Sequence, residues 1–124
     1  MSVRRVILLA ALALAACSDF GPSLGPGILT ATLRSPNGNE GAAVLILLGD
    51  GVIDVNAVGG TEAYATTSGE TTRVVLINQS GGTLAVDVEM SDRRRRPVAL
   101  VQEVAGPDDE LRSDLSGYRV ELGR

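Results

Sequence analysis

Regularly spaced turn residues are the feature that most limits how this chain can fold. From residue 28 onward, breaks rich in Gly, Asn, Asp, Ser or Pro recur about every 9 to 13 residues. This spacing favours short β-strands over helices, which need longer uninterrupted segments. Eight strands are predicted between the breaks, and they cover residues 28–33, 42–48, 52–58, 62–67, 71–78, 83–90, 98–105 and 118–122.

The clearest strand signal is a strict alternation of apolar and polar residues. Leu84, Val86, Val88 and Met90 alternate with smaller or charged residues, and segment 118–122 repeats the pattern. A period of two places alternate side chains on opposite faces of a strand. Each of these segments is therefore predicted to turn one face to a core and the other to water.

Two segments depart from this alternation. Residues 42–48 are seven consecutive apolar residues flanked by Glu40 and Asp50, which predicts a strand covered on both faces with charged gatekeepers at its ends. Residues 107–116 begin with acids and place Leu111 and Leu115 four positions apart, ahead of Gly117. That pattern predicts one or two helical turns between the last two strands.

Together these signals predict an all-β fold, an antiparallel β-sandwich of Ig-like or jelly-roll type, over residues 28–124. The tract 31–44, with the later segment 72–76, is similar to the cohesin and carbohydrate-binding type of bacterial sandwich. This similarity carries no diagnostic motif, so it supports the fold alone.

The first 17 residues have the three zones of an export signal. Residues 1–5 carry two arginines, residues 6–16 are eleven uncharged apolar residues, and small residues precede Cys17. Eleven residues are too few for a membrane span, which takes about 20 helical residues. The segment is therefore predicted to be a signal peptide rather than a transmembrane helix.

The sequence Leu14-Ala15-Ala16-Cys17 resembles the lipobox of bacterial lipoproteins. The resemblance implies that residues 1–16 are a signal peptide and that Cys17 becomes a lipidated N-terminus. It also implies a cell-envelope protein anchored to a membrane. The outer membrane is favoured in cells with two membranes, because the residue after the cysteine is Ser18 and not Asp. The alternatives are an ordinary secretory signal or a buried free thiol.

Residues 17–27 are interpreted as a Gly/Pro-rich tether. The ten residues that follow Cys17 include three Gly and two Pro. Without residues 1–16, nine arginines face 15 acidic residues, a formal charge of −6. This acidic balance argues against nucleic acid as a partner.

Missing residue types exclude most catalytic chemistry. The chain has no His and one Cys, which removes Ser/His/Asp and Cys/His centres and imidazole metal sites. The acids at 50–54 and 108–110 lack the ligand pattern of a calcium loop, and Asp87 and Glu89 are interpreted as solvated charges. We therefore expect no enzyme activity, no metal and no cofactor.

Four consecutive arginines, Arg93, Arg94, Arg95 and Arg96, precede Pro97 and form the sharpest charge feature. One interpretation is a solvated hairpin loop partly neutralised by nearby acids. The other is a contact for an acidic envelope protein, a lipid headgroup or an anionic polymer, because guanidinium groups bind carboxylate and phosphate bidentately.

The function that these signals favour is a membrane-tethered, non-catalytic envelope lipoprotein that acts as a structural or protein-interaction module. The alternative is a lipoprotein that captures a small ligand or glycan. Beyond the tether, Tyr64 and Tyr118 are the aromatic residues, which disfavours a sugar-stacking face. An enzyme that uses carboxylates, serines or arginines is a third interpretation.

Overall fold

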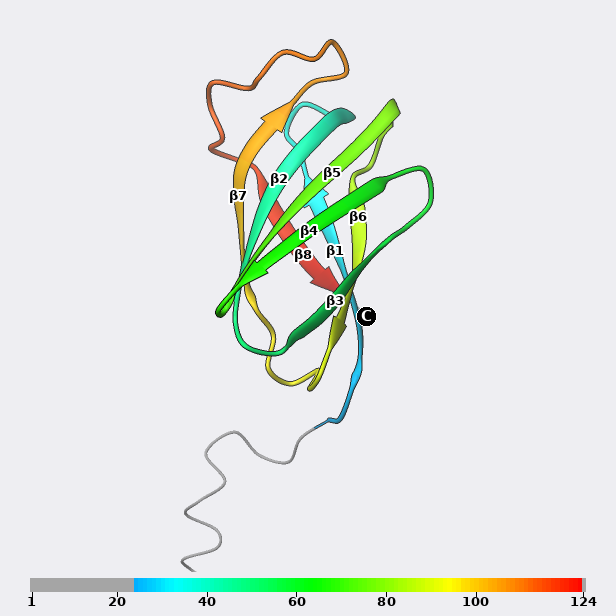
Figure 1. Cartoon of the computed structure of the whole chain (residues 1–124). Helices are drawn as coiled ribbons and strands as arrows, with labels where there is room; N and C mark the ends of the chain where they lie inside the picture. Colours follow the sequence, from blue (N-terminus) through cyan, green and yellow to red (C-terminus); the bar gives the residue numbers. More distant parts are fainter. Residues whose placement is uncertain (1–23, 124) are drawn as a thin grey trace, which may run out of the picture.

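The protein is a β-sandwich of eight strands, seen in a computed structural model that describes residues 24–123 (Figure 1). Two four-stranded antiparallel sheets pack face to face, sheet A in the order β3-β6-β1-β8 and sheet B in the order β4-β5-β2-β7. The strands are β1 (Gly27–Arg34), β2 (Glu40–Leu48), β3 (Val52–Ala57), β4 (Glu62–Ser68), β5 (Thr71–Gly82), β6 (Ala85–Met90), β7 (Val98–Ala105) and β8 (Arg119–Gly123). The prediction of an all-β antiparallel sandwich with eight strands is confirmed.

Most connections pass from one sheet to the other. Within residues 24–123, only β4 and β5 follow each other in the same sheet, and the other six connections cross. The interpretation of Arg93 to Arg96 as a hairpin loop is therefore wrong, because β6 and β7 lie in different sheets. The spacing of turn residues sets strand length but does not specify which sheet the next strand joins.

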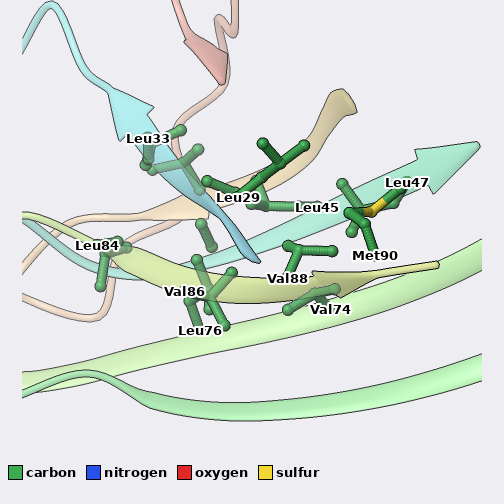
Figure 2. Close-up of a cluster of buried hydrophobic side chains, with 13 residues drawn as sticks. Leu29, Leu33, Leu45, Leu47, Val74, Leu76, Leu84, Val86, Val88 and Met90 are labelled. Carbon is green, nitrogen blue, oxygen red and sulfur yellow. The ribbon is translucent and has the colours of Figure 1, made fainter. Parts of the chain in front are cut away.

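The core fills the space between the sheets. Figure 2 shows side chains of β1 and β6 from sheet A and of β2 and β5 from sheet B directed into this layer. Leu84, Val86, Val88 and Met90 are at most 1% exposed, which confirms the alternation predicted for their segment. The buried apolar residues are Leu29, Ala31, Leu33, Ala43, Leu45, Leu47, Val74, Leu76, Leu84, Val86, Val88, Met90 and Val104.

Strand β2 has one buried and one open face. Leu45 and Leu47 are fully buried, while Val44 and Ile46 on the opposite face are half-buried. The predicted cover on both faces is therefore wrong for the outer face. Continuous apolar sequence does not by itself show that both faces of a strand are covered.

No helix forms between β7 and β8. The backbone N–H of Asp109 donates to the Gly106 carbonyl and that of Gly106 to Glu110, so the segment turns back on itself. Leu111 pairs with Ala105 in an isolated bridge and is 70% exposed, whereas Leu115 packs against the core. The two leucines therefore do not share a helix face, and the predicted helical turns are wrong.

Candidate functional site

The arginine run forms the connection between β6 and β7, at the end of the sandwich where the described chain begins (Figure 1). Arg93 donates from Nη2 to the Leu24 carbonyl at 3.0 Å, and its backbone N–H donates to the Gly25 carbonyl at 3.0 Å. Arg96 donates from Nη1 to the Leu122 carbonyl at 2.8 Å. Two of the four arginines thus fasten the ends of the domain to this connection.

The other two arginines lie on the surface. The side chains of Arg94 and Arg95 are exposed, and Arg95 lies 3.8 Å from the Asp50 carboxylate in a loose ion pair. The Asp92 carboxylate accepts the backbone N–H groups of Leu24 and Arg94. Hydrogen bonds to backbone N–H groups therefore hold the connection in place, and the side chains of Arg94 and Arg95 are exposed at the surface.

A pocket of about 210 Å³ lies beside these arginines. Its lining residues are Leu24, Leu29, Arg93, Arg94 and Arg96. The Nε of Arg93 is buried and has no hydrogen-bond partner within residues 24–123. Because each guanidinium carries five N–H donors, this pocket is suited to a small anion such as a phosphate group.

The connections before and after β7 carry opposite charge. The connection 91–97 holds four arginines and one aspartate, while the connection 106–118 holds four acids and one arginine. These connections lie at opposite ends of β7, at the bottom and the top of Figure 1. Eight strand residues separate the ends by about 26 Å. Arginines are thus concentrated at one end, where Asp50 and Glu70 also lie, and acids at the other. We call these the basic end and the acidic end.

A buried carboxylate lies near the acidic end. Glu40 is 1% exposed, and Arg112 donates to it from Nη2 at 2.7 Å and from Nε at 3.2 Å. The Tyr118 hydroxyl donates to the same carboxylate at 2.5 Å and accepts from Asn37 Nδ2 at 2.8 Å. The hydrogen bond with Glu40 raises the pKa of Arg112 above its ordinary value, against the opposing effect of burial.

This network fastens the connection 106–118 to the start of β2. Oε1 of Glu40 accepts a charge-assisted hydrogen bond from Arg112, and Oε2 accepts a short hydrogen bond from the Tyr118 hydroxyl. Glu40, predicted as a charged gatekeeper of the apolar segment, is buried, because Arg112 and Tyr118 contact it from much later positions in the chain. Glu40 is therefore a structural group whose two oxygens are already occupied by Arg112 and Tyr118.

An open cleft of about 450 Å³ adjoins the same end, lined in part by Arg34 and Arg119. Glu121 accepts from Arg34 in an ion pair of 2.6 Å and from Arg119 at 3.4 Å. The hydrogen bond from Arg34 lowers the pKa of Glu121, partly opposed by desolvation. Both arginines of the cleft are therefore already engaged by one carboxylate.

The outer face of sheet B is apolar mainly along β2 and β7, while the outward residues of β4 and β5 include Thr66, Thr71 and Arg73. In register across the sheet, Val44 lies between Val75 and Glu103, and Ile46 lies between Arg73 and Leu100. Tyr64 extends the first row on β4. Large apolar side chains on or beside this face are 39 to 70% exposed, namely Leu48, Tyr64, Val98, Leu100 and Leu111.

Leu111 lines one side of a shallow groove at a corner of this face. The groove is lined by side chains that are mostly apolar and come from β2, β5, β7 and the connection after β7. These residues are Ala42, Ala43, Val44, Val75, Glu103, Ala105 and Leu111. We call the outward residues of sheet B together with Leu111 the sheet B face. Contiguous exposed apolar surface of this kind marks contact sites in soluble domains.

The remaining predicted residues have simple positions. Cys17 lies outside the described residues. Asp87 accepts the Thr30 hydroxyl at 2.8 Å on the outer face of sheet A. Residues 24–123 contain no group of three His, Cys, Asp or Glu side chains placed to hold a metal ion, and no helix among them has the length and apolarity to cross a membrane.

Sequence reasoning missed the two features that distinguish this domain. The Glu40 network joins residues 72 and 78 positions apart, and no local pattern marks such a pair. The sheet B face did leave a signal, the apolar run 42–48, which was assigned to the core. Comparison with known proteins adds no family, since no family model, curated protein or solved structure matches the chain.

Proposed function

We propose that this chain is a lipid-anchored, non-catalytic protein of the bacterial cell envelope that binds another protein through the sheet B face. The anchor is Cys17, on the strength of the lipobox-like Leu14-Ala15-Ala16-Cys17 and the signal-like residues before it. Two or more acyl chains anchor a protein stably, whereas one chain holds it only marginally. Tethering of this kind places the sandwich at a membrane surface.

The single observation that carries the binding role is the exposed apolar sheet B face. Four strands at about 4.8 Å spacing and six residue steps at about 3.4 Å give a face on the order of 400 Å². Stable complexes bury about 800 Å² on each partner. The size therefore favours a small, reversible contact rather than a permanent assembly.

The charges on this face define the partner's chemistry. Arg73 on β5 and Glu103 on β7 lie diagonally on either side of the apolar centre formed by Val44 and Ile46. A complementary partner is a folded protein that offers an apolar patch flanked by a carboxylate and a cation. Such flanking charges fix orientation and suppress wrong partners more than they add affinity.

Two observations support a role without catalysis or ligand capture. The buried carboxylate of Glu40 is saturated by Arg112 and Tyr118. The arginines of the large cleft are balanced by Glu121. Neither place presents convergent groups awaiting a substrate, which is what an enzyme or a small-ligand receptor requires.

Binding is tested by crosslinked affinity capture of the lipidated protein from its own envelope. The wild type is compared with Ile46→Lys on the inner strand β2 of sheet B. The matched control is Thr32→Lys on the inner strand β1 of sheet A, which adds the same charge to the other outer face. We expect Ile46→Lys to lose the partner and Thr32→Lys to keep it, with both variants folded by circular dichroism.

The captured protein is then purified and its binding to the same three proteins measured by calorimetry. Retention of binding by Ile46→Lys contradicts the assignment of the face. Sedimentation equilibrium of the protein alone shows whether a second copy occupies the face, which would contradict a different protein as partner.

The anchor is tested separately. Replacing Cys17 with Ala should leave unprocessed precursor and abolish acyl labelling, because the thiol that accepts the lipid is gone. Mass spectrometry of the mature protein that shows an unmodified Cys17 overturns the anchor.

A further inference from the structure

We propose that the basic end of the sandwich docks on anionic phospholipid headgroups, so that the domain stands on the membrane with its acidic end outward. This inference rests on the lipid anchor of the proposed function. It adds a second contact with the membrane and a defined orientation, neither of which a lipid anchor alone provides.

Position along the chain is the first argument. Leu24 is held at the basic end by Asp92 and Arg93, at 3.1 and 3.0 Å. The described chain therefore begins beside the arginine connection and not at the acidic end. Any anchor that precedes Leu24 draws this end of the domain toward the membrane.

The length of the chain before Leu24 is the second argument. Seven residue steps separate Cys17 from Leu24. A segment of this length spans at most about 25 Å when fully extended. Electrostatic attraction decays over about 8 Å at physiological ionic strength. This reach is about three times the screening length, so the anchor holds the arginines near the membrane surface but does not by itself bring them into contact with headgroups.

The chemistry of the surface is the third argument. Arg94 and Arg95 are exposed at this end, and the adjoining pocket of about 210 Å³ is lined by three arginines. The donors offered to a headgroup phosphate are the guanidinium groups of Arg94 and Arg95, whose side chains are exposed. Leu24 and Ile28, each about half exposed, lie at the same end and can rest among the headgroups.

Charge on the rest of the domain reinforces one orientation. The connection 106–118, with four acids and one arginine, lies at the far end of β7. A negative membrane surface repels this end while it attracts the connection 91–97. Each arginine near such a surface is worth about 1 kcal/mol. Loss of Arg94 and Arg95 should thus lower the ratio of docked to undocked domain about thirtyfold, which corresponds to about 2 kcal/mol.

Tryptophan fluorescence gives a direct test, because the chain contains no Trp. One reporter variant carries Thr71→Trp, at the basic end, and a second carries Glu110→Trp, at the acidic end. Protein that starts at Cys17 is coupled through this thiol to a maleimide lipid in vesicles that contain a headgroup-nitroxide quencher. The vesicles are phosphatidylcholine alone or phosphatidylcholine with phosphatidylglycerol.

We expect strong quenching at position 71 and weak quenching at position 110, in anionic vesicles only, with the difference falling as salt rises. Arg94→Ser with Arg95→Ser should abolish the difference. The control pair Arg34→Ser with Arg119→Ser, which removes the same charge at the opposite end of sheet A, should preserve it. Equal quenching in both kinds of vesicle, or no effect of the Arg94 and Arg95 changes, overturns the docking.

Chemical coupling makes this result independent of how the cell treats Cys17. Absence of acyl labelling in the cell overturns the proposed anchor, whereas loss of the quenching difference on coupled protein overturns the docking. Protein that stays in solution after coupling is removed by flotation before the measurement, so that both outcomes concern membrane-bound protein alone.

Discussion

Glu40 and Arg112 form an ion pair across 72 positions of sequence, with Nη2 of Arg112 2.7 Å from Oε1 of a carboxylate that is 1% exposed. Glu40 is the first residue of β2, and Arg112 lies in the connection between β7 and β8. The backbone of Arg112 also donates to the Val104 carbonyl at 2.8 Å. The pair therefore fastens the acidic connection to both β2 and β7 of sheet B.

The first prediction concerns the two halves of this pair. Arg112→Ala leaves a buried carboxylate without its cation, and an uncompensated buried charge typically costs about 3 kcal/mol or more. Glu40→Gln removes the charge but keeps the shape and leaves Arg112, whose side chain is 31% exposed, able to reach water. We expect urea unfolding to show a greater loss of stability for Arg112→Ala than for Glu40→Gln.

A double variant provides the control. Glu40→Gln with Arg112→Ala has no buried charge, so it should be more stable than Arg112→Ala alone. A double variant less stable than either single variant would show that the network stabilises by packing rather than by pairing.

The second prediction concerns the acid sensitivity of Glu121. Its folded pKa lies below the ordinary value of 4.5, chiefly through the hydrogen bond from Arg34. A lowered folded pKa means that the contribution to stability is complete above the unfolded pKa and is lost as pH falls through the folded value. The stability difference between wild type and Glu121→Gln should therefore be present at neutral pH and shrink below about pH 4.5.

Unfolding midpoints measured across this pH range provide the check. The effect should be small and should weaken with salt, because the two side chains of this ion pair are about half exposed. Arg34→Gln should remove most of the same pH dependence. A difference that grows as pH falls would contradict the sign.

The sequence was sufficient for the strands and their inward faces because these depend on local signals. The range 98–105 matches β7, and Val86 and Val88 point inward as alternation requires. Sheet partners and crossings depend on contacts between distant segments, so local sequence does not show that the connection 91–97 joins two different sheets and is not a hairpin. The same limit applies within the arginine run, where only the folded chain shows that Arg93 and Arg96 hold backbone carbonyls.

The third prediction compares neighbouring leucines on β2. Leu47 is fully buried between the sheets, while Leu48 is 39% exposed on the sheet B face. Leu47→Ala should destabilise the domain by about 2 to 5 kcal/mol, because it removes core contacts and leaves a cavity. Leu48→Ala is the matched control and should cost much less. Thermal unfolding of the two variants tests which of the two leucines faces the core, and equal losses of stability would contradict this assignment.

The last prediction concerns Gly27 and Arg93. A Cβ built on Gly27 would lie 2.0 Å from Cδ of Arg93, in the middle of a side chain that reaches the Leu24 carbonyl. Gly27→Ala should therefore displace the Arg93 guanidinium and break this hydrogen bond, a loss of about 1 kcal/mol. Arg93→Ser breaks the same bond directly. Since both changes act on one contact, the double variant should be less destabilised than the sum of the two single variants, by about 1 kcal/mol.

Gly123→Ala with Arg93→Ser is the control cycle, because a Cβ at Gly123 meets no atom within 4 Å. The losses of stability caused by those two changes should be additive. Proteolysis of the chain next to Leu24 is a second measurement, since release of Leu24 from Arg93 exposes its backbone to cleavage. Additive losses in the Gly27 cycle, with unchanged proteolysis, would show that Arg93 does not hold the start of the domain, and the basic end would then lose its fixed position beside the tether.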